Sequence, residues 1–435
     1  MQTVILPARA GPIHARLADG LLRATGIPYA QAGRWQPPSP LPPGPIDARR
    51  PAPACPQLAV ERLDAILPDA FRGLSFSEDC LHLSVTAPAQ AQAAPVMVWL
   101  HGGSYESAAG DMAVFDPAAL VREQGVVVVA VTHRLGLLGW LGHDGRPANL
   151  GALDVIAALA WIAVAISAFG GDPQRVTLFG QSSGGDLIAR LLTATAARGL
   201  FHRAIIQSAP LHLGLRNTAM KRVMRREAAG LDHDAPLPAI LSRQARIRRA
   251  VRRFGLAGQM PFGPEFGAAP FPPEAELTRA HAEAAPGLPL LIGHVQDEAQ
   301  LFLPPQPRPV LEPLRRGMVR LLTRRLYARP ARQFAAHQHA SGGAVGRYVI
   351  DWGAGPWGGT HLAELPLLFP GPDWLQTPLL PVGMDLDRLT ALGAPLRRIW
   401  AEFARTGQPQ PQRIDGVIRL VTGAQAGQAM PPRKR

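Results

Sequence analysis

The chain has 435 residues, and hydrophobic residues make up 47% of them, which is enough for a large buried core. Length alone would suggest two or three domains. The formal net charge is +13 at pH 7, and almost all of the positive charge is arginine, since only Lys221 and Lys434 are lysines. An arginine excess with abundant Ala, Pro and Gly is typical of a GC-rich bacterial genome, and no nucleic-acid motif accompanies it, so we predict no nucleic-acid partner.

We expect no export signal at the beginning of the chain. This region contains Arg9, Arg16 and Asp19 and no sustained apolar stretch. We therefore expect a cytoplasmic protein, with secretion or a periplasmic location as the alternative. No run of about 18 apolar residues reads as membrane-spanning, so no integral membrane segment is expected. The proline-rich range 35–56 is expected to form an irregular surface loop.

The first strong strand signal is the apolar run Val96–Leu100, which is typical of a buried strand. It is followed by His101-Gly102-Gly103-Ser104-Tyr105. Glycines directly after a strand let backbone N–H groups point into a site without side chains in the way. The two glycines by themselves are equally compatible with an ordinary loop.

An α/β unit follows. The range 152–168 is apolar with helical spacing and ends in a Gly-Gly-Asp-Pro turn at 170–173. The β-branched run Val176–Phe179 comes next, and a second helical pattern covers 186–196. A buried strand between two helices predicts a doubly wound sheet.

The turn after that strand reads Gly180-Gln181-Ser182-Ser183-Gly184. A Gly-x-Ser-x-Gly pattern at the end of a strand predicts a nucleophilic serine on a sharp strand-to-helix turn. The positions two before and two after that serine have no room for side chains. Ser182 satisfies this condition, whereas Ser183 would put a glutamine at the first of those positions. The alternative is a Gly/Ser-rich loop without chemistry.

Together these motifs resemble the type-B carboxylesterases, the branch of the α/β-hydrolases that includes bacterial para-nitrobenzyl esterases and the cholinesterases. Further matches run through most of the chain in the family's order. In chain order they are Gly26-Ile27-Pro28-Tyr29-Ala30, Ser77-Glu78-Asp79-Cys80-Leu81-His82-Leu83, Arg134-Leu135-Gly136, Asn149-Leu150-Gly151, Phe169-Gly170-Gly171-Asp172-Pro173, Leu200 to Ser208 and Phe403-Ala404-Arg405-Thr406-Gly407.

The resemblance implies the α/β-hydrolase fold, a mostly parallel central sheet flanked by helices. One domain is expected over residues 1–423, because the motifs along the chain have to lie on a single sheet to form one site. Residues 424–435 are expected to form a flexible C-terminal tail. The segments 208–262 and 298–361 are short for the family. We therefore expect shortened gorge-wall insertions and a more open site.

The resemblance also implies the catalytic acid and histidine. The family carries its acid in Asp-Glu-Gly after a strand, which matches Glu298 in Asp297-Glu298-Ala299, with Asp297 as the alternative. Its histidine precedes an E-L-P run, which matches His361. The histidine follows the acid in chain order in this fold. His337 and His339 also lie beyond Glu298 and are expected to be surface residues.

Other family positions carry over in the same way. The oxyanion hole would consist of the N–H groups of Gly103, Ser104 and Ser183. Cys55 and Cys80 match positions that form a disulfide in many members, although reduced thiols are equally compatible with a cytoplasmic protein. Arg34 and Glu78 match a structural salt bridge. The family usually has Glu where this chain has Gln181, which weakens the case for choline-like substrates.

Three arginine-rich clusters stand out: 221–226, 243–253 and 315–325. In the second, Ile247 and Val251 are four residues apart among arginines, which predicts an amphipathic helix with a basic face. We interpret these clusters as solvated faces, with contact to a membrane surface or a polyanion as the alternative.

The sequence thus predicts a serine hydrolase that cleaves small-molecule carboxylic esters with a Ser182–His361–Glu298 triad, without a cofactor or a metal. The alternatives are the same triad acting on a lactone, carbamate or amide bond, or a non-catalytic binding protein on the hydrolase fold. A monomer or small homo-oligomer is expected.

Overall fold

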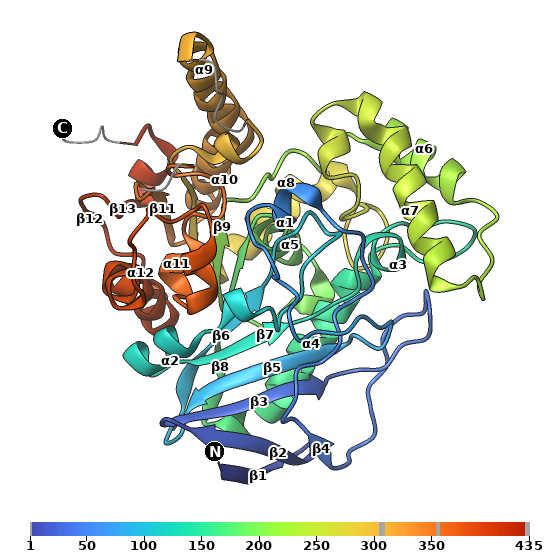
Figure 1. Ribbon diagram of the computed structural model, residues 1–435, viewed down its shortest axis with the longest axis vertical. Helices are drawn as coiled ribbons and strands as arrows, with labels where there is room; N and C mark the ends of the chain where they lie inside the picture. The colour runs from blue at the N-terminus through green and yellow to red at the C-terminus, as the bar shows by residue number, and fades with distance from the viewer. Residues whose placement is uncertain (1, 304–308, 354–356, 431–435) are drawn as a thin grey trace.

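The computed structural model describes residues 2–303, 309–353 and 357–430, and one sheet of 13 strands runs through them (Figure 1). In sheet order the strands are β1 (Gln2–Ala8), β2 (Gly11–Ala18), β3 (Leu21–Pro28), β5 (His82–Pro88), β7 (Val127–Val131), β6 (Ala94–Leu100), β8 (Gly171–Gln181), β9 (Arg203–Gln207), β10 (Leu290–Val295), β11 (Val345–Ile350), β13 (Ile418–Thr422) and β12 (Gln412–Ile414), while β4 (Ile46–Asp47) pairs with β2.

The strands from β7 to β11 pair in parallel, and antiparallel strands extend the sheet at both edges. Both faces of a parallel sheet are covered by other elements, so its strands appear in the sequence as nearly continuous apolar runs. The run Val96–Leu100 does so, because every residue of β6 is buried. The strands predicted at residues 96–100 and 176–179 are both present, as parts of β6 and β8.

Helices cover both faces of this sheet (Figure 1). Their bounds are α1 (Glu61–Asp64), α2 (Ala118–Gln124), α3 (Gly136–Gly139), α4 (Leu150–Ala165), α5 (Ser183–Leu191), α6 (Thr218–Ala228), α7 (Leu237–Val251), α8 (Leu277–Ala284), α9 (Glu312–Thr323), α10 (Arg329–Ala340), α11 (Leu365–Leu368) and α12 (Leu386–Thr406). The mostly parallel sheet between helices confirms the predicted α/β-hydrolase fold.

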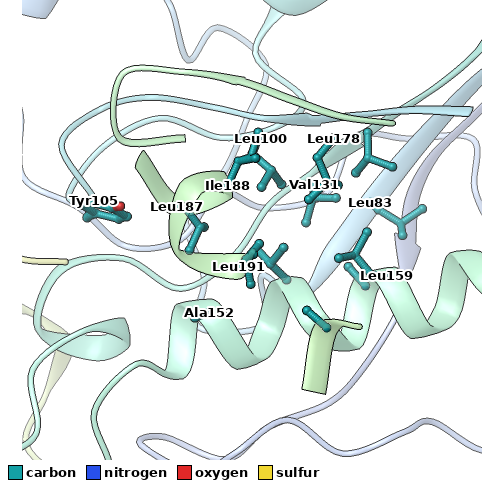
Figure 2. Close-up of a cluster of buried hydrophobic side chains, with 14 of the residues drawn as sticks. Leu83, Leu100, Tyr105, Val131, Ala152, Leu159, Leu178, Leu187, Ile188 and Leu191 are labelled. Carbon is teal, nitrogen blue, oxygen red and sulfur yellow. The ribbon is translucent and has the colours of Figure 1, made fainter. Parts of the chain in front are cut away.

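The alternation of side chains along each strand divides the core in two. Val98 and Leu100 of β6 belong to the cluster that contains residues of α4 and α5, whereas Trp99 belongs to the cluster with α2 and α12. Successive strand residues point to opposite faces, so one strand serves both layers. Figure 2 shows Leu100 and Leu178 from the sheet beside Leu187 and other apolar side chains of the first cluster.

Helix α4 departs from one expectation. The stretch Leu150–Phe169 is long and apolar enough to cross a membrane by length and composition, with a mean hydropathy of 2.2, whereas the sequence analysis identified no such run. Half of that window is buried within the protein, and Leu159 and Ile162 are inaccessible. Its place against the sheet is that of a core helix.

The C-terminal segment corrects a second expectation. Residues Gly423–Gly427 form a short 3-10 helix, and Ala426 is fully buried. Arg347 of β11 donates hydrogen bonds to the carbonyl oxygens of Ala426 and Gln428, which tie the segment to the sheet. The predicted tail at 424–435 therefore begins too early in the chain, and its last residues, 431–435, lie outside the described residues.

The structure also places the two residue pairs that the resemblance assigns to the scaffold. Arg34 Nε donates to Glu78 Oε2 at 2.8 Å, as the resemblance implied. Cys55 and Cys80 are buried free thiols that lie in hydrogen-bond contact. This hydrogen bond, followed by burial, raises the pKa of Cys80 well above its ordinary value. The disulfide stays a prediction.

Candidate active site

The carboxyl ends of four parallel strands bring the predicted residues to one edge of the sheet. Ser182 follows β8 directly, and the two glycines of the predicted oxyanion loop follow β6. Glu298 lies three residues beyond β10, and His361 lies beyond β11. Neighbouring parallel strands end at the same edge, so residues distant in sequence meet there.

Ser182 occupies a strained turn. It has φ 58° and ψ −123°, a conformation that costs energy for any residue with a Cβ. An added Cβ at Gly180 would lie 2.7 Å from the carbonyl oxygen of Leu100, and one at Gly184 would lie 2.0 Å from it. Both glycines are therefore required by a close approach of strand β6, as the Gly-x-Ser-x-Gly spacing predicts.

The neighbouring Ser183 has a different environment. It is 1% exposed, and its hydroxyl oxygen accepts a hydrogen bond from the N–H of Tyr105 at 3.3 Å. Ser182 is less buried, so it is the serine that a substrate can reach. The side chain of Ser183 supports the loop that follows β6.

That loop turns tightly beside the serine. Gly103 has φ 101° and Ser104 has φ 58°, and the carbonyl oxygen of Gly103 accepts from the N–H groups of Glu106 and Ser107. An added Cβ at Gly102 would lie 3.1 Å from the Cβ of Ser182, which shows how close the loop comes.

The N–H groups of this region are available for a ligand. Within the described part of the chain, Gly103 and Ser104 donate no backbone hydrogen bond to a protein acceptor. Ser183 is the first residue of α5, whose leading N–H groups have no acceptor inside the helix. All three flank Ser182, where donors can meet a developing negative charge.

Glu298 and His361 form a buried pair. Glu298 Oε2 lies 2.5 Å from His361 Nδ1, and Glu298 Oε1 accepts from the N–H of Val295 at 3.0 Å. Glu298 is inaccessible and His361 is 3% exposed. The alternative acid, Asp297, instead donates its backbone N–H to Gly359 in the loop before the histidine.

The other ring nitrogen of the histidine meets an amide. Gln181 Nε2 lies 3.2 Å from His361 Nε2, so with the imidazole proton on Nδ1 the amide donates to Nε2. Burial alone would lower the pKa of His361, but the charge and hydrogen bond of Glu298, together with the charge of Glu364, outweigh it and raise the pKa above its ordinary value.

Glu364 is the feature that the sequence analysis missed. It is 1% exposed, and Ser208 donates its hydroxyl to Glu364 Oε1 at 2.8 Å. Burial, followed by the charge of Glu298, raises the pKa of Glu364 to about 7. Its place in the E-L-P run after His361 was visible in the sequence, but nothing in that run shows that the side chain turns inward.

Aromatic rings enclose the histidine. The ring centres of Tyr327 and Phe302 lie 5.5 Å and 5.9 Å from that of His361. Tyr327 is buried and precedes α10, so the chain between acid and histidine supplies this wall. Of the histidines expected at the surface, His339 is exposed and His337 is half-buried, and both lie on α10. Among the described residues, no group of three or more His, Cys, Asp or Glu residues could hold a metal ion.

The sequence model of the carboxylesterase family matches residues 24–310. The chain belongs to the carboxylesterase family. The carboxylesterase is 37% identical to a probable N-octanoylanthranilate hydrolase, AqdA2, of Rhodococcus erythropolis, over 94% of this chain and 93% of that protein. It is 31% identical to the para-nitrobenzyl esterase of Bacillus subtilis (strain 168), over 94% of this chain and 91% of the relative.

Solved esterase structures also match this fold. A thermophilic PNB esterase superposes with a TM-score of 0.78 at 28% identity, covering 96% of this chain and 97% of the other. These relatives confirm the predicted resemblance and make the protein a carboxylesterase, so the alternative of a non-catalytic binding protein is dropped.

Proposed function

We propose that this carboxylesterase hydrolyses small-molecule carboxylic esters with Ser182 as nucleophile, His361 as base and Glu298 as the orienting acid. The observation that carries the proposal is the buried contact of 2.5 Å between Glu298 Oε2 and His361 Nδ1 at the sheet edge that carries the strained serine. This contact keeps the imidazole proton on Nδ1, so Nε2 is the nitrogen that accepts the serine proton.

The reaction then proceeds in two halves. Ser182 Oγ attacks the ester carbonyl while His361 takes the hydroxyl proton, and the N–H groups of Gly103, Ser104 and Ser183 stabilise the oxyanion. The tetrahedral intermediate collapses to an acyl-enzyme, and the imidazolium gives its proton to the departing alcohol. Water repeats these steps and releases the acid. Because the Gln181 amide donates to the same nitrogen that must accept the serine proton, the amide has to turn aside when substrate binds.

A pair of serine variants tests this proposal. Ser182→Ala should lower turnover of p-nitrophenyl butyrate by on the order of 10⁴–10⁶ while the circular dichroism spectrum stays that of the wild type. Ser183→Ala is the matched control and should act far less, because it keeps the backbone N–H of residue 183 and loses only one hydrogen bond of 3.3 Å to the loop after β6. A loss in Ser183→Ala alone, or equal losses in both variants, would contradict the assignment.

An amide bond, one of the alternatives that the sequence leaves open, is the second candidate. The relative that is 37% identical over nearly the whole chain is named as a probable hydrolase of N-octanoylanthranilate. Values of kcat/KM for N-octanoylanthranilate and p-nitrophenyl octanoate, measured on the same preparation, decide between the two bonds. Turnover of both that disappears in Ser182→Ala would assign both activities to one site, whereas no turnover of the anthranilate would reject the second candidate.

A further inference from the structure

A cavity of about 300 Å³ lies between the C-terminal strands and the helices α9 and α10. Ser182 and His361 do not line it. His294 and Gln296, at the end of β10, form part of its wall. Six arginines line the same cavity: Arg320, Arg324, Arg329, Arg332, Arg347 and Arg419.

Arg347 is the most deeply buried of these cations. It lies on β11 and is 3% exposed. Its Nε donates to the carbonyl oxygen of Ala426 at 2.6 Å, and its Nη2 donates to that of Gln428 at 2.5 Å. Carbonyl oxygens satisfy part of the guanidinium but do not neutralise it. A buried charge without a counterion is costly, and the structure records no ion pair between Arg347 and any of the described residues.

The charges around Arg347 do not compensate for it. Burial, then Arg332 and Arg419, lower the pKa of Arg347 to about 10. Asp351, four residues further along the chain, is held by Arg419 through two hydrogen bonds of 2.5 Å and 2.7 Å. Glu298 also acts on His294, but its two oxygens bind His361 and the N–H of Val295.

The remaining arginines bring further uncompensated charge. Within residues 2–303, 309–353 and 357–430, the structure records no ion pair for Arg320, Arg324, Arg329 or Arg332. Elsewhere on α9, Arg315 and Arg316 both pair with Glu312. Arg320, which lines the cavity from the same helix, therefore differs from these two neighbours.

We propose that this cavity is a binding site for a compact phosphate-bearing anion, such as a diphosphate group. Guanidinium groups are planar forks whose paired N–H donors match the oxygens of phosphate, and several of them converge here on one space. The volume is at the lower end for small-molecule sites, which fits a group of a few heavy atoms. The bound anion supplies Arg347 with a counterion that none of the described residues provides.

Inorganic pyrophosphate is the probe, titrated calorimetrically into the full chain in chloride buffer of constant ionic strength. Saturable binding of about one equivalent is expected. Arg324→Gln/Arg332→Gln should raise the Kd by about tenfold or more, since each charge-assisted hydrogen bond that is lost weakens binding. Arg347 stays in place in this variant, because its removal from the core would test folding instead.

The control variant Arg249→Gln/Arg252→Gln also removes two positive charges, from two exposed arginines three residues apart at the C-terminal end of α7. It should bind pyrophosphate like the wild type. No saturable binding by the wild type, or an equal Kd in the two double variants, would overturn the proposal. Citrate tests the chemical class: weaker binding than pyrophosphate supports a phosphate site, and tighter binding overturns it.

Discussion

Two buried carboxylates act on His361, and their environments differ. Glu298 has both oxygens in hydrogen bonds, one with His361 Nδ1 and one with the N–H of Val295. Glu364 accepts from Ser208 on one oxygen, and among the described residues its other oxygen has no partner. Burial is almost complete for both. The difference lies in the donors that each carboxylate has available.

The comparison shows how one site can hold two acids with separate tasks. Donors to both oxygens favour the charged form, which is the form that orients and stabilises an imidazolium. With fewer donors and with Glu298 nearby, Glu364 has its pKa raised to about 7 by burial first and by that neighbouring charge second. We therefore expect Glu298 to be essential for turnover and Glu364 to adjust the titration of His361.

The largest expected effect follows from replacing the paired acid. Glu298→Gln should lower kcat by on the order of 10³–10⁴, because the amide can hold the histidine in the wrong tautomer. Asp297→Asn should do much less, since Asp297 contributes its backbone N–H to the site. Steady-state rates with p-nitrophenyl butyrate measure both variants. The reverse ranking would show that the catalytic acid is Asp297.

The second prediction concerns stability. The unfolded chain ionises Glu364 at its ordinary pKa and the folded protein only near 7, so the free energy of unfolding should fall as pH rises from about 4.5 to 7. The variant Glu364→Gln lacks this loss. On going from pH 5 to pH 8, its free energy of unfolding should therefore increase by about 1–3 kcal/mol relative to that of the wild type. Urea denaturation at both pH values measures the gain. Glu283→Gln, at an exposed site, should show none.

The third prediction is kinetic. Catalysis needs neutral His361, whose pKa is raised, so kcat/KM should increase with pH through a midpoint above the ordinary imidazole value of about 6.5. Glu364→Gln should lower that midpoint, because one of the charges that raise the pKa of His361 is removed. Identical midpoints in the wild type and the variant would mean that Glu364 does not act on the base.

The smallest expected effect concerns Gln181, the uncharged residue that contacts Nε2 of His361. Because Gln181 carries no charge, butyrylcholine should show no advantage in kcat/KM over butyl butyrate. Gln181→Glu should create a preference for the cationic ester, since it places a negative charge beside His361 at the site. A strong choline preference in the wild type would point to a different negative group at the site.

The strands and the strained turn could be predicted from the sequence because their causes are local. Apolar runs mark the buried strands, and Gly180 and Gly184 mark a close backbone approach that no other residue permits. Glu298 and His361 came from resemblance to a family, since nothing around either residue identifies a partner 63 positions away. Their pairing depends on which strands are neighbours in the sheet.

Other features have no local signature at all. The contact between Gln181 and His361 joins residues 180 positions apart. The arginine cavity draws on α9, α10, β11 and β13, and only its α9 residues and Arg324 belong to a cluster visible in the sequence. The packed segment around Ala426 was missed because its alternating Gly, Ala and Gln show neither helical nor strand periodicity.

The positive φ of Ser182 has a consequence for how this protein evolves. Glycine would adopt that conformation with less strain, so an inactive Ser182→Gly copy of the chain is expected to withstand denaturant better than the active one. Thermal robustness and ester turnover are therefore opposed at this single codon. A screen that rewarded survival on heating and ignored activity would tend to discard the proposed nucleophile, and the serine is expected to persist only where turnover itself is under selection.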